Sequence, residues 1–456
     1  MTDCNTNGLV FTPQGRRAVI ADFGGGAITS DAGALLLREV DRRLGLTERI
    51  DQVVPDPRDP LRIAHTQLTL LRQRIYGIAL GYEDGNDHQT LRDDPVMQLI
   101  ARPKDTFGAV DRGIDPDRPL ASPPTLCRLE NRVNRQTNMA IAEELVEAFI
   151  RSFKQPPKEL ILDFDATDDE VHGNQVGRFF HGYYDHYCFL PLYVFCGTQL
   201  LAAYLRPSNI DASKHSRAIL KLLVERFRQA WPQVKILFRA DSGFCRWRLL
   251  RWCDRHQVDY LVGIAKNSRL LELAEPLMQE AQRRFEATGQ DQRLFTETDY
   301  AAQTWDRSRR TIIKAEHNSQ GPNPRFVVTS LQGQAQSLYD TIYCARGECE
   351  NRIKEQQLGL FADRTSCHDF DANQFRVLLS AAAYVLVETL RREHLIGTAL
   401  QEAQMPTIRL KLLKIGARVV ASVRRIVLHL ASGYPLQNLL RDLVTRLSSP
   451  MPNLSG

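Results

Sequence analysis

Features that mark membrane-bound or exported proteins are missing from this sequence of 456 residues. The longest nearly unbroken apolar stretch, Val377 to Val387, has only 11 residues, whereas a helix that crosses a bilayer needs about 20. The first residues, Met1 to Asn7, have no basic region followed by an apolar core, so no signal peptide is predicted. We therefore expect a cytoplasmic protein without a membrane span.

Cysteine pairs and a strong excess of charge are also missing. The nine cysteines are odd in number, and no two have the two-residue spacing of a zinc knuckle or a redox pair, which argues against a disulfide scaffold or a cysteine-based metal site. Lysine and arginine together number 59, and aspartate and glutamate 54. The net charge of +5 is too small to indicate a polyanionic partner by itself, so the position of the charges matters more.

What remains is the composition of a folded, globular protein. Hydrophobic residues make up 43% and charged residues 25% of the chain, close to globular averages. The length corresponds to about three domains of ~150 residues each. The sequence pattern changes along the chain and divides it into five parts: 1–157, 158–268, 269–335, 336–400 and 401–456.

The first part, residues 1–157, is predicted to be mainly helical, with loops marked by glycine and proline. Helical spacing is found in three segments: Asp31–Leu44, Leu61–Leu80 and Thr125–Val133. A pair of these helices, the second of which carries Arg128, Asn131 and Arg132, is a candidate helix-turn-helix that reads DNA. A small helical domain with ordinary exposed arginines is the alternative.

The second part, residues 158–268, alternates strands with helices. Strands are predicted at Glu159–Phe164, His186–Cys196, Leu200–Leu205, Val234–Phe238 and Tyr260–Ile264. Amphipathic helices are predicted at Lys214–Ala230 and Cys245–His256. This order predicts an α/β fold, with a mixed sheet and helices packed on it.

The later parts add an insertion, a final helical layer and a basic end. Residues 269–335 begin with a charged helix and continue with strand-like segments, which predicts a β-rich insertion that splits the α/β domain. Residues 336–400 return to helical spacing, and the apolar run at 377–387 is predicted to be a buried helix. Within 401–456, the stretch Arg409–Leu430 has no acidic residue and six basic ones: Arg409, Lys411, Lys414, Arg418, Arg424 and Arg425. Such a stretch contacts phosphates or forms a solvated face.

Two carboxylates at strand ends are the first candidates for chemistry. Asp165 ends the first predicted strand and Asp241 ends the fourth, at the edge of the sheet where α/β folds bind ligands. Two carboxylates in one pocket repel each other and need a cation. Two hard cations held about 3.5–4 Å apart by carboxylates activate the attacking oxygen and stabilise the leaving oxygen in phosphodiester chemistry.

A third carboxylate comes from a predicted helix that begins near Thr341. Spacings of three and four place Tyr343, Arg346, Glu350 and Lys354 on one face of this helix. That face combines one candidate metal ligand with cations that can hold a phosphate. Glu348 and Glu355 fall on other faces of the helix.

Each candidate has a plainer alternative. Asp163 points to the same face of the strand as Asp165 and is a possible replacement for it. Asp241 alone could cap a helix, and Glu350 alone could pair with Lys354 on a surface helix. The acidic run Asp168 to Glu170 is expected to be a solvated turn. Three histidines have spacings that fit no common zinc site, which predicts turn or core hydrogen bonds for them: His172, His181 and His186.

Three motifs in this order resemble a known catalytic signature. They are Asp-x-Thr at 165–167, Asp-Ser-Gly-Phe at 241–244 and Tyr-x2-Arg-x3-Glu at 343–350. Together they resemble the signature of bacterial insertion-sequence transposases of the DDE type. The phrases at 167–175, 182–187 and 350–355 are similar to one subgroup, DDE domain group 1. The resemblance covers essentially the whole chain.

This resemblance implies an RNase H-like catalytic core, a β-rich insertion before the last acidic helix, and cut-and-paste movement of a mobile element. It implies two Mg²⁺ ions, with Mn²⁺ as a substitute, held by the catalytic residues Asp165, Asp241 and Glu350. The expected partners are terminal inverted repeats and target DNA, bound by a homodimer at the bacterial nucleoid. The expected DNA contacts are Tyr343, Arg346, Arg352, Lys354, Arg418, Arg424 and Arg425.

One position departs from the family pattern. Related transposases have a lysine seven residues after the glutamate, where this chain has Gln357, and the nearest basic residues are Arg352 and Lys354. Two other functions stay open at this point. One is an RNase H-like nuclease for structured DNA that does not join strands, and the other is a DNA-binding regulator derived from a transposase.

Overall fold

The computed structural model describes residues 8–102, 118–422 and 424–448. The chain forms two compact units. Unit 1 contains residues 1–129 and 386–456, and unit 2 contains residues 130–385. The two ends of the chain therefore belong to one unit, whereas the sequence pattern had placed them in separate parts.

Unit 1 is mainly helical, as predicted for the N-terminal part. The helices of its N-terminal half are α1 (Ala34–Leu44), α2 (Leu46–Val53), α3 (Gln67–Leu80), α4 (His88–Leu91), α5 (Pro95–Ala101) and α6 (Pro123–Glu130), which ends at the unit boundary. Thr66 caps α3 by accepting a hydrogen bond from the Thr69 amide, and Gly81 ends it in a left-handed conformation. The two segments that were candidates for a helix-turn-helix correspond to α3 and α6. They are not joined by a short turn, because α4 and α5 lie between them.

Strands that the sequence pattern did not reveal connect the two ends of the chain. β1 (Leu9–Gln14) and β2 (Arg17–Ala21) form an exposed hairpin. β3 (Ile28–Thr29) pairs with β16 (Ala417–Ala421), which pairs in turn with β17 (Ile426–Leu430). The C-terminal part also contributes α14 (Met405–Ile408) and α15 (Gln437–Ser448). The β3–β16 pair explains why residues 386–456 join unit 1.

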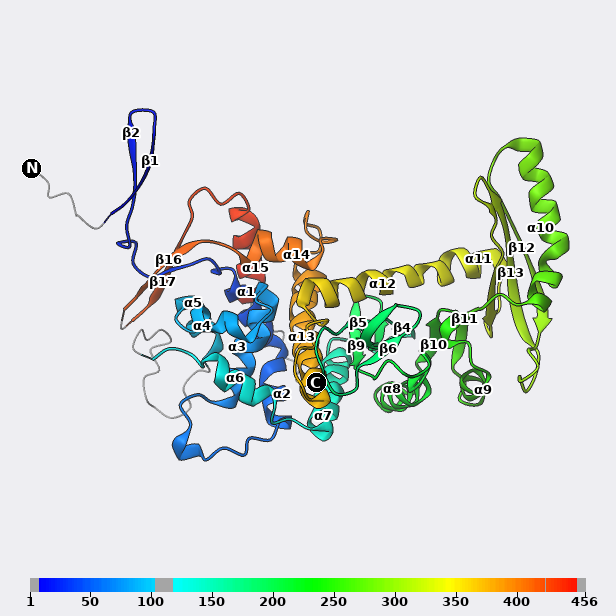
Figure 1. Ribbon diagram of the computed structural model, residues 1–456, viewed down its shortest axis with the longest axis horizontal. Helices are drawn as coiled ribbons and strands as arrows, with labels where there is room; N and C mark the ends of the chain where they lie inside the picture. The colour runs from blue at the N-terminus through cyan, green and yellow to red at the C-terminus, as the bar shows by residue number, and fades with distance from the viewer. Residues whose placement is uncertain (1–7, 103–117, 423, 449–456) are drawn as a thin grey trace, which may run out of the picture. The chain divides into compact units, whose positions relative to one another are not determined.

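Unit 2 is built on a nine-stranded mixed sheet (Figure 1). Its strands are β4 (Glu159–Ala166), β8 (Leu192–Cys196), β9 (Gln199–Tyr204), β10 (Lys235–Ala240), β11 (Asp259–Ile264), β12 (Gln292–Tyr300), β13 (Arg309–Asn318), β14 (Gly321–Pro322) and β15 (Arg325–Thr329). β4, β10 and β11 are parallel, while β8 and β9 continue the sheet antiparallel on the other side of β4. This is the α/β core with a mixed sheet that was expected.

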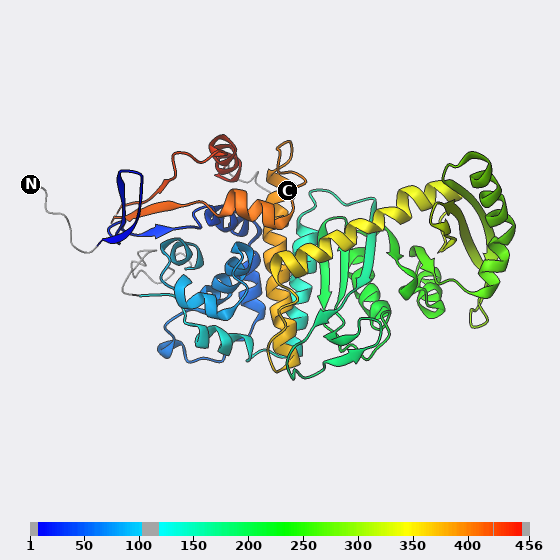
Figure 2. The same ribbon diagram turned by 45° about the horizontal axis from the view of Figure 1, so that its top comes forward.

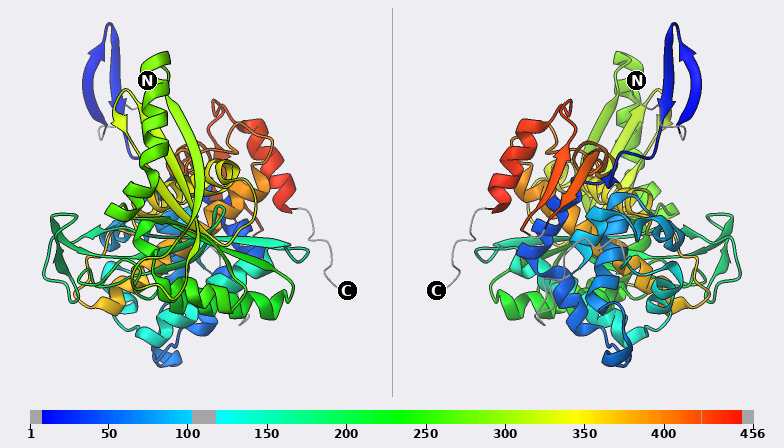
Figure 3. Two further views of the ribbon diagram at one scale, coloured as in Figure 1. Left: turned by 90° about the vertical axis from the view of Figure 1, so that its right-hand side faces the viewer. Right: turned by 90° about the vertical axis from the view of Figure 1, so that its left-hand side faces the viewer.

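The β-rich segment after residue 268 extends this sheet. β15 pairs antiparallel with β11, and β13 pairs with both β15 and β12. Helix α10 (Ser268–Thr288) packs along β12 and β13 (Figure 3). The expected insertion is therefore rich in strands, but it is continuous with the core because the free edge of β11 provides hydrogen bonds for β15.

Helices cover both faces of the sheet. On one face, Leu160, Leu162 and Phe164 pack with α7 (Arg135–Arg151), α8 (Ser216–Ala230) and α9 (Trp247–Arg255). On the other face, Ile161 and Leu237 pack with residues of a continuous helical segment, 335–359. This segment includes α11 (Ala335–Ser337) and α12 (Gly347–Lys354), and Figure 2 shows it crossing the strands. Because side chains alternate along a strand, Asp163 and Asp165 share the second face with Ile161.

The apolar run at 377–387 lies in α13 (Phe370–Thr389), and all of its residues are buried except the half-buried Val385. This confirms the predicted buried helix. In the part of the chain that the structure describes, no helix is long and apolar enough to span a membrane.

A second, small sheet follows Asp165. It has the order β5 (Asp169–Glu170), β7 (His186–Phe189), β6 (Phe179–His181). The single strand predicted at 186–196 is therefore two strands in two sheets, since β7 ends before Leu190 and Pro191 and β8 begins at Leu192. The apolar pattern alone does not show that the chain leaves one sheet and enters the other at these two residues.

Candidate active site

The register of the parallel strands places two carboxylates side by side. Asp163 on β4 is paired with Arg239 on β10, and Phe164 is paired with Ala240. The next position of the same register brings Asp165 next to Asp241, and neighbouring strands lie about 4.8 Å apart. Asp241 also accepts a hydrogen bond of 2.9 Å from the Gly243 amide. The predicted capping role of Asp241 is thus present, and it occurs beside Asp165.

Arg346 joins the strand carboxylates to the helix. Its Nη1 donates to Asp165 Oδ2 at 3.0 Å, and its Nη2 donates to Glu350 Oε1 at 2.6 Å. The side chains of Arg346 and Asp165 are 17% and 14% exposed, while that of Glu350 is 49% exposed. One guanidinium therefore connects two carboxylates that lie 185 positions apart in the sequence.

The charges of Asp241 and Glu350 both act on the carboxyl group of Asp165. Burial, together with the charges of Asp241 and Glu350, raises the pKa of Asp165 to about 7, against the lowering effect of Arg346. A single arginine does not compensate three neighbouring carboxylates in a partly buried site. The structure thus brings Asp165, Asp241 and Glu350 together, and it leaves an excess of negative charge there.

Asp163, the alternative to Asp165, has a partner of its own. Its carboxylate receives two hydrogen bonds from Arg239, one of them 2.7 Å long between Arg239 Nη2 and Asp163 Oδ2. Both side chains are buried, and Arg239 also donates to the backbone oxygen of Ile342 on the covering helical segment. This ion pair fastens the segment to the sheet and favours Asp165 as the available ligand.

Tyr343 packs against the sheet at a position where a glycine leaves room for its hydroxyl group. A Cβ atom at Gly263 on β11 would lie 2.6 Å from the Tyr343 hydroxyl oxygen, 3.0 Å from the Ser242 amide nitrogen and 3.3 Å from the Asp241 carbonyl carbon. Only glycine leaves room for the tyrosine and the Asp241 turn at this point. The sequence analysis did not single out Gly263, because its role depends on a helix 80 residues later in the chain.

We expect Gly263→Ala to disturb the site through this contact. The added methyl group must displace the Tyr343 ring or the Asp241 turn, which should destabilise the fold by about 1–3 kcal/mol and slow DNA cleavage roughly 10- to 100-fold. Thermal unfolding and cleavage rates measure the two effects. Gly347→Ala on α12 is the matched control, because a Cβ there meets no atom within 4 Å. Equal behaviour of the two variants would contradict the contact.

The other candidate residues on the covering helical segment differ in their exposure and in their ion-pair partners. Arg352 is 12% exposed and pairs with Glu355 at 2.8 Å and with the exposed Glu348 at 3.8 Å. Lys354 is exposed, and in the described part of the chain no ion pair is found for it. Glu350 pairs with Arg346, not with Lys354 as the surface-helix alternative required.

Gln357, at the position of the family's lysine, faces the protein. Its Nε2 donates to the Asp168 backbone oxygen and to Asp169 Oδ1, both at 2.8 Å. Asp169 is fully buried in β5, so the expectation that residues 168–170 form a solvated turn is wrong for this residue. Burial, with the charges of Asp363 and Asp168, raises the pKa of Asp169 to about 8, while the Gln357 hydrogen bond lowers it. His186 hydrogen-bonds with Asp168 at 2.8 Å, as the prediction of a hydrogen-bonding role requires, but it does so from strand β7 and not from a turn.

Residues 11–452 match the family described as Transposase DDE domain group 1. The chain belongs to this transposase family. Among solved structures, a piggyBac transposase in a synaptic complex with hairpin DNA aligns with 94% of this chain and 87% of its own chain, at 10% sequence identity and a TM-score of 0.41. No match was found among curated proteins.

Membership of this transposase family implies the use of a divalent metal, and the site offers suitable donors. Carboxylate oxygens are the ligands that hard cations such as Mg²⁺ take in proteins. Within residues 8–102, 118–422 and 424–448, no three His, Cys, Asp or Glu side chains form a ready metal site. Arg346 instead lies between Asp165 and Glu350. The three carboxylates are the kind of donors that a hard divalent cation takes, and the Arg346 guanidinium occupies the space between two of them.

Of the six basic residues in the run at 409–425, two are half-buried and four are exposed. Arg409 is half-buried and its Nε donates to the Ala79 backbone oxygen at 2.9 Å. Lys414 pairs with Asp31 at 2.7 Å. Arg418, Arg424 and Arg425 are exposed on β16 and next to the start of β17. Two of the six basic residues thus have structural roles inside unit 1, and the other four, Lys411 included, are exposed to solvent.

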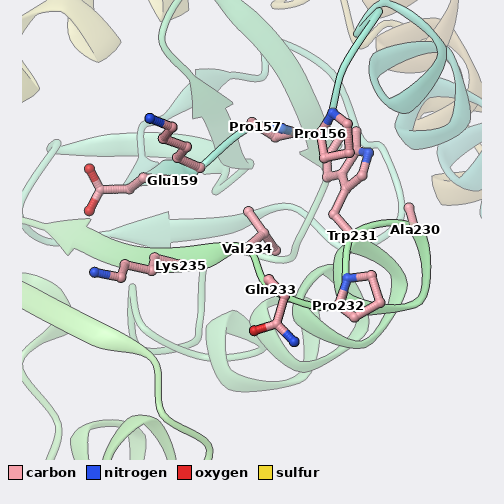
Figure 4. Close-up of a pocket in the computed structure, with 10 residues that line it drawn as sticks. Pro156, Pro157, Glu159, Ala230, Trp231, Pro232, Gln233, Val234 and Lys235 are labelled. Atoms are coloured by element: carbon pink, nitrogen blue, oxygen red, sulfur yellow. The ribbon is translucent and has the colours of Figure 1, made fainter.

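The pocket shown in Figure 4 lies away from this site. It measures about 670 Å³ and is lined by residues at the start of β4 and β10, among them Lys158, Trp231 and Lys235. Asp165 and Asp241 stand at the opposite ends of the same two strands. The candidate catalytic residues of the transposase therefore lie at the carboxyl ends of β4 and β10, at the opposite end of these strands from the pocket.

Proposed function

We propose that this transposase cleaves DNA at the ends of its mobile element and joins the freed 3′-hydroxyl ends to target DNA. Asp165, Asp241 and Glu350 are the catalytic carboxylates. The observation that carries the proposal is the Arg346 bridge between Asp165 and Glu350, formed directly beside Asp241. It joins β4 to the covering helical segment at the strand end where the register places Asp165 next to Asp241.

The three carboxylates would hold two Mg²⁺ ions, with Mn²⁺ as a substitute. When bound, these ions supply activation of the attacking oxygen and stabilisation of the leaving oxygen. The neighbouring side chains would hold the three carboxylates in position. The Asp163–Arg239 ion pair keeps the helix in place on the sheet, and the contact of Tyr343 with Gly263 fixes the turn that carries Asp241.

Arg346 has a second role in this proposal. Without metal it neutralises part of the charge on Asp165 and Glu350. With cations bound at the carboxylates, its guanidinium would be available to hold the scissile phosphate, for which its planar fork is well suited. Tyr343 and Lys354 lie on the same face of the helix as Arg346 and would contact the same DNA strand.

Three further groups of residues would also contact the DNA. Lys354 is the better substitute for the family's later lysine, because Arg352 is already paired with Glu355. Arg418, Arg424 and Arg425 would hold the DNA backbone, and the N-terminal region 1–157 would recognise the terminal inverted repeats. Two element ends must be handled together, so we propose a homodimer on DNA. A chromosomal substrate would place the protein at the nucleoid in the bacterial cytoplasm.

The exposed arginines make a measurable prediction. Replacing Arg418, Arg424 and Arg425 with alanine should flatten the dependence of log affinity for DNA on log salt by about 0.9 for each lost phosphate contact. Binding to a duplex at several salt concentrations gives the slope. The matched control is Arg248→Ala on α9, another exposed arginine, which should leave the slope unchanged. An unchanged slope in the triple variant would mean that these arginines form a solvated face.

Product analysis tests the function itself. Purified protein is incubated with Mg²⁺ and DNA that carries the ends of the element, and the cut positions and new junctions are sequenced. We expect cuts at the ends and joined products. Cuts without any new junction would indicate a nuclease, and binding without cuts would indicate a transposase-derived regulator.

A further inference from the structure

Residues 178–187, which we call the aromatic hairpin, carry an unusual number of rings. Seven of these ten residues are Phe, Tyr or His. The hairpin consists of β6, a turn and the first part of β7. Phe180 is 53% exposed, Tyr183 85% and Tyr187 48%. Large aromatic side chains that gather at the surface mark a binding site more often than chance exposure does.

The rings of the aromatic hairpin support one another. Phe180 meets Tyr187 edge to face with 5.7 Å between ring centres, and Tyr183 meets Tyr184 in the same way at 5.0 Å. The Arg178 guanidinium lies 4.4 Å from the centre of the Tyr187 ring. The exposed rings are therefore held in position before any partner binds, next to a cation.

The aromatic hairpin lies next to the candidate active site. His186 contacts the Asp168 carboxylate at 2.8 Å, only three residues after Asp165. Burial and the charges of Asp168 and Asp165 raise the pKa of Tyr184 to about 12. The Tyr184 hydroxyl is thus within electrostatic reach of a proposed catalytic carboxylate.

We propose that the aromatic hairpin is a stacking platform for unpaired DNA bases beside the cleavage site. Every base has a flat face that can stack on an aromatic ring, whereas paired bases in a duplex hide this face. A positive guanidinium beside the rings suits the phosphates that accompany such bases. The platform rests on the proposed function in so far as that function brings DNA to Asp165.

Binding to single-stranded DNA without metal tests the platform. The full-length protein is titrated in EDTA against a labelled single strand of mixed sequence and against the matching duplex. In the Phe180→Ala/Tyr183→Ala variant we expect single-strand affinity to fall on the order of tenfold or more, with less than about a twofold change for the duplex. Phe180→Tyr/Tyr183→Phe keeps both rings and should restore binding.

The control is Leu222→Ala on α8, which removes a side chain of unit 2 that is 60% exposed and distant in sequence from the hairpin. Its affinity for both DNAs should stay unchanged, and thermal unfolding should show that all variants fold. Unchanged single-strand affinity, or an equal loss for single strand and duplex, would overturn the platform. So would a loss of self-association in the variant compared with the unaltered protein without DNA, since the rings would then bind a second copy of the chain.

The two proposals can fail separately. If the ring variant loses single-strand binding while the unaltered protein never cuts element ends, the platform stands and the proposed function fails. If the unaltered protein cuts and joins DNA while the ring variant binds single strands normally, the platform alone is wrong.

Discussion

Replacing Asp241 with asparagine should lower DNA cleavage on the order of a thousandfold, because stabilisation of the reacting oxygens by divalent cations contributes several kcal/mol. Asparagine has the shape of aspartate but lacks the charge that a cation requires. Its side-chain oxygen can still accept the hydrogen bond from the Gly243 amide that the aspartate accepts. The turn after β10 should therefore survive, and the loss should be one of chemistry.

Cleavage rates under single-turnover conditions, on a DNA end bound in advance, measure this loss. Binding of the same DNA end in EDTA and thermal unfolding serve as controls, and both should be close to those of the unaltered protein. An Asp241→Asn protein that cleaves at the normal rate would show that this carboxylate holds no essential metal.

The second large effect is expected at Glu350, and it should be absent at its neighbour Glu348. Glu350 shares Arg346 with Asp165, at 2.6 Å and 3.0 Å. Glu348 is 67% exposed and lies 3.8 Å from Arg352 instead. Two residues of a helix that are two positions apart point about 200 degrees away from each other. Glu350→Gln should therefore abolish strand cleavage, and Glu348→Gln should keep most of it.

The Glu350→Gln and Glu348→Gln variants serve as controls for each other, because both changes remove one negative charge from the same helix. Rates are compared with Mg²⁺ in excess, so that a weakened affinity for metal does not hide a change in chemistry. The opposite ranking of the two variants would mean that the third motif has been read in the wrong register.

The core strands could be predicted from the sequence because each is a short apolar run with a turn signal behind it. β4, β10 and β11 begin and end within two residues of the prediction, and the α/β class with a mixed sheet is confirmed. The pairing of β15 with β11 could not be predicted. Which edge a strand joins depends on hydrogen bonds between residues more than 60 positions apart, and no local pattern records them.

Charge patterns were informative only in part, for the same reason. The basic run at 409–425 was visible as a local bias, but Lys414 finds its partner at Asp31, more than 380 residues earlier. Asp169 was expected to belong to a solvated acidic turn, but Gln357 of the helical segment donates a hydrogen bond to its carboxyl group. Both burial and pairing are decided by distant segments, so residue type and spacing alone do not reveal them.

The candidate catalytic residues could be identified from the sequence because each stands in a local motif. The residues that position them could not be identified in this way. Asp165, Asp241 and Glu350 each stand in a short recognisable phrase. Gly263 and the Asp163–Arg239 pair act by positioning those phrases in space, and their roles follow from the strand register and the covering helix. Their identification needed the structure.

The most direct test of the account is a change of metal preference at Asp165. A cysteine thiolate is a softer ligand than a carboxylate, so it accepts Mn²⁺ more readily than Mg²⁺. If Asp165 binds the catalytic cation, Asp165→Cys should be nearly inactive in Mg²⁺ and recover cleavage in Mn²⁺ by roughly tenfold or more, while the unaltered protein cleaves with both metals. Cleavage by Asp165→Cys in Mg²⁺ at the rate of the unaltered protein would contradict the account.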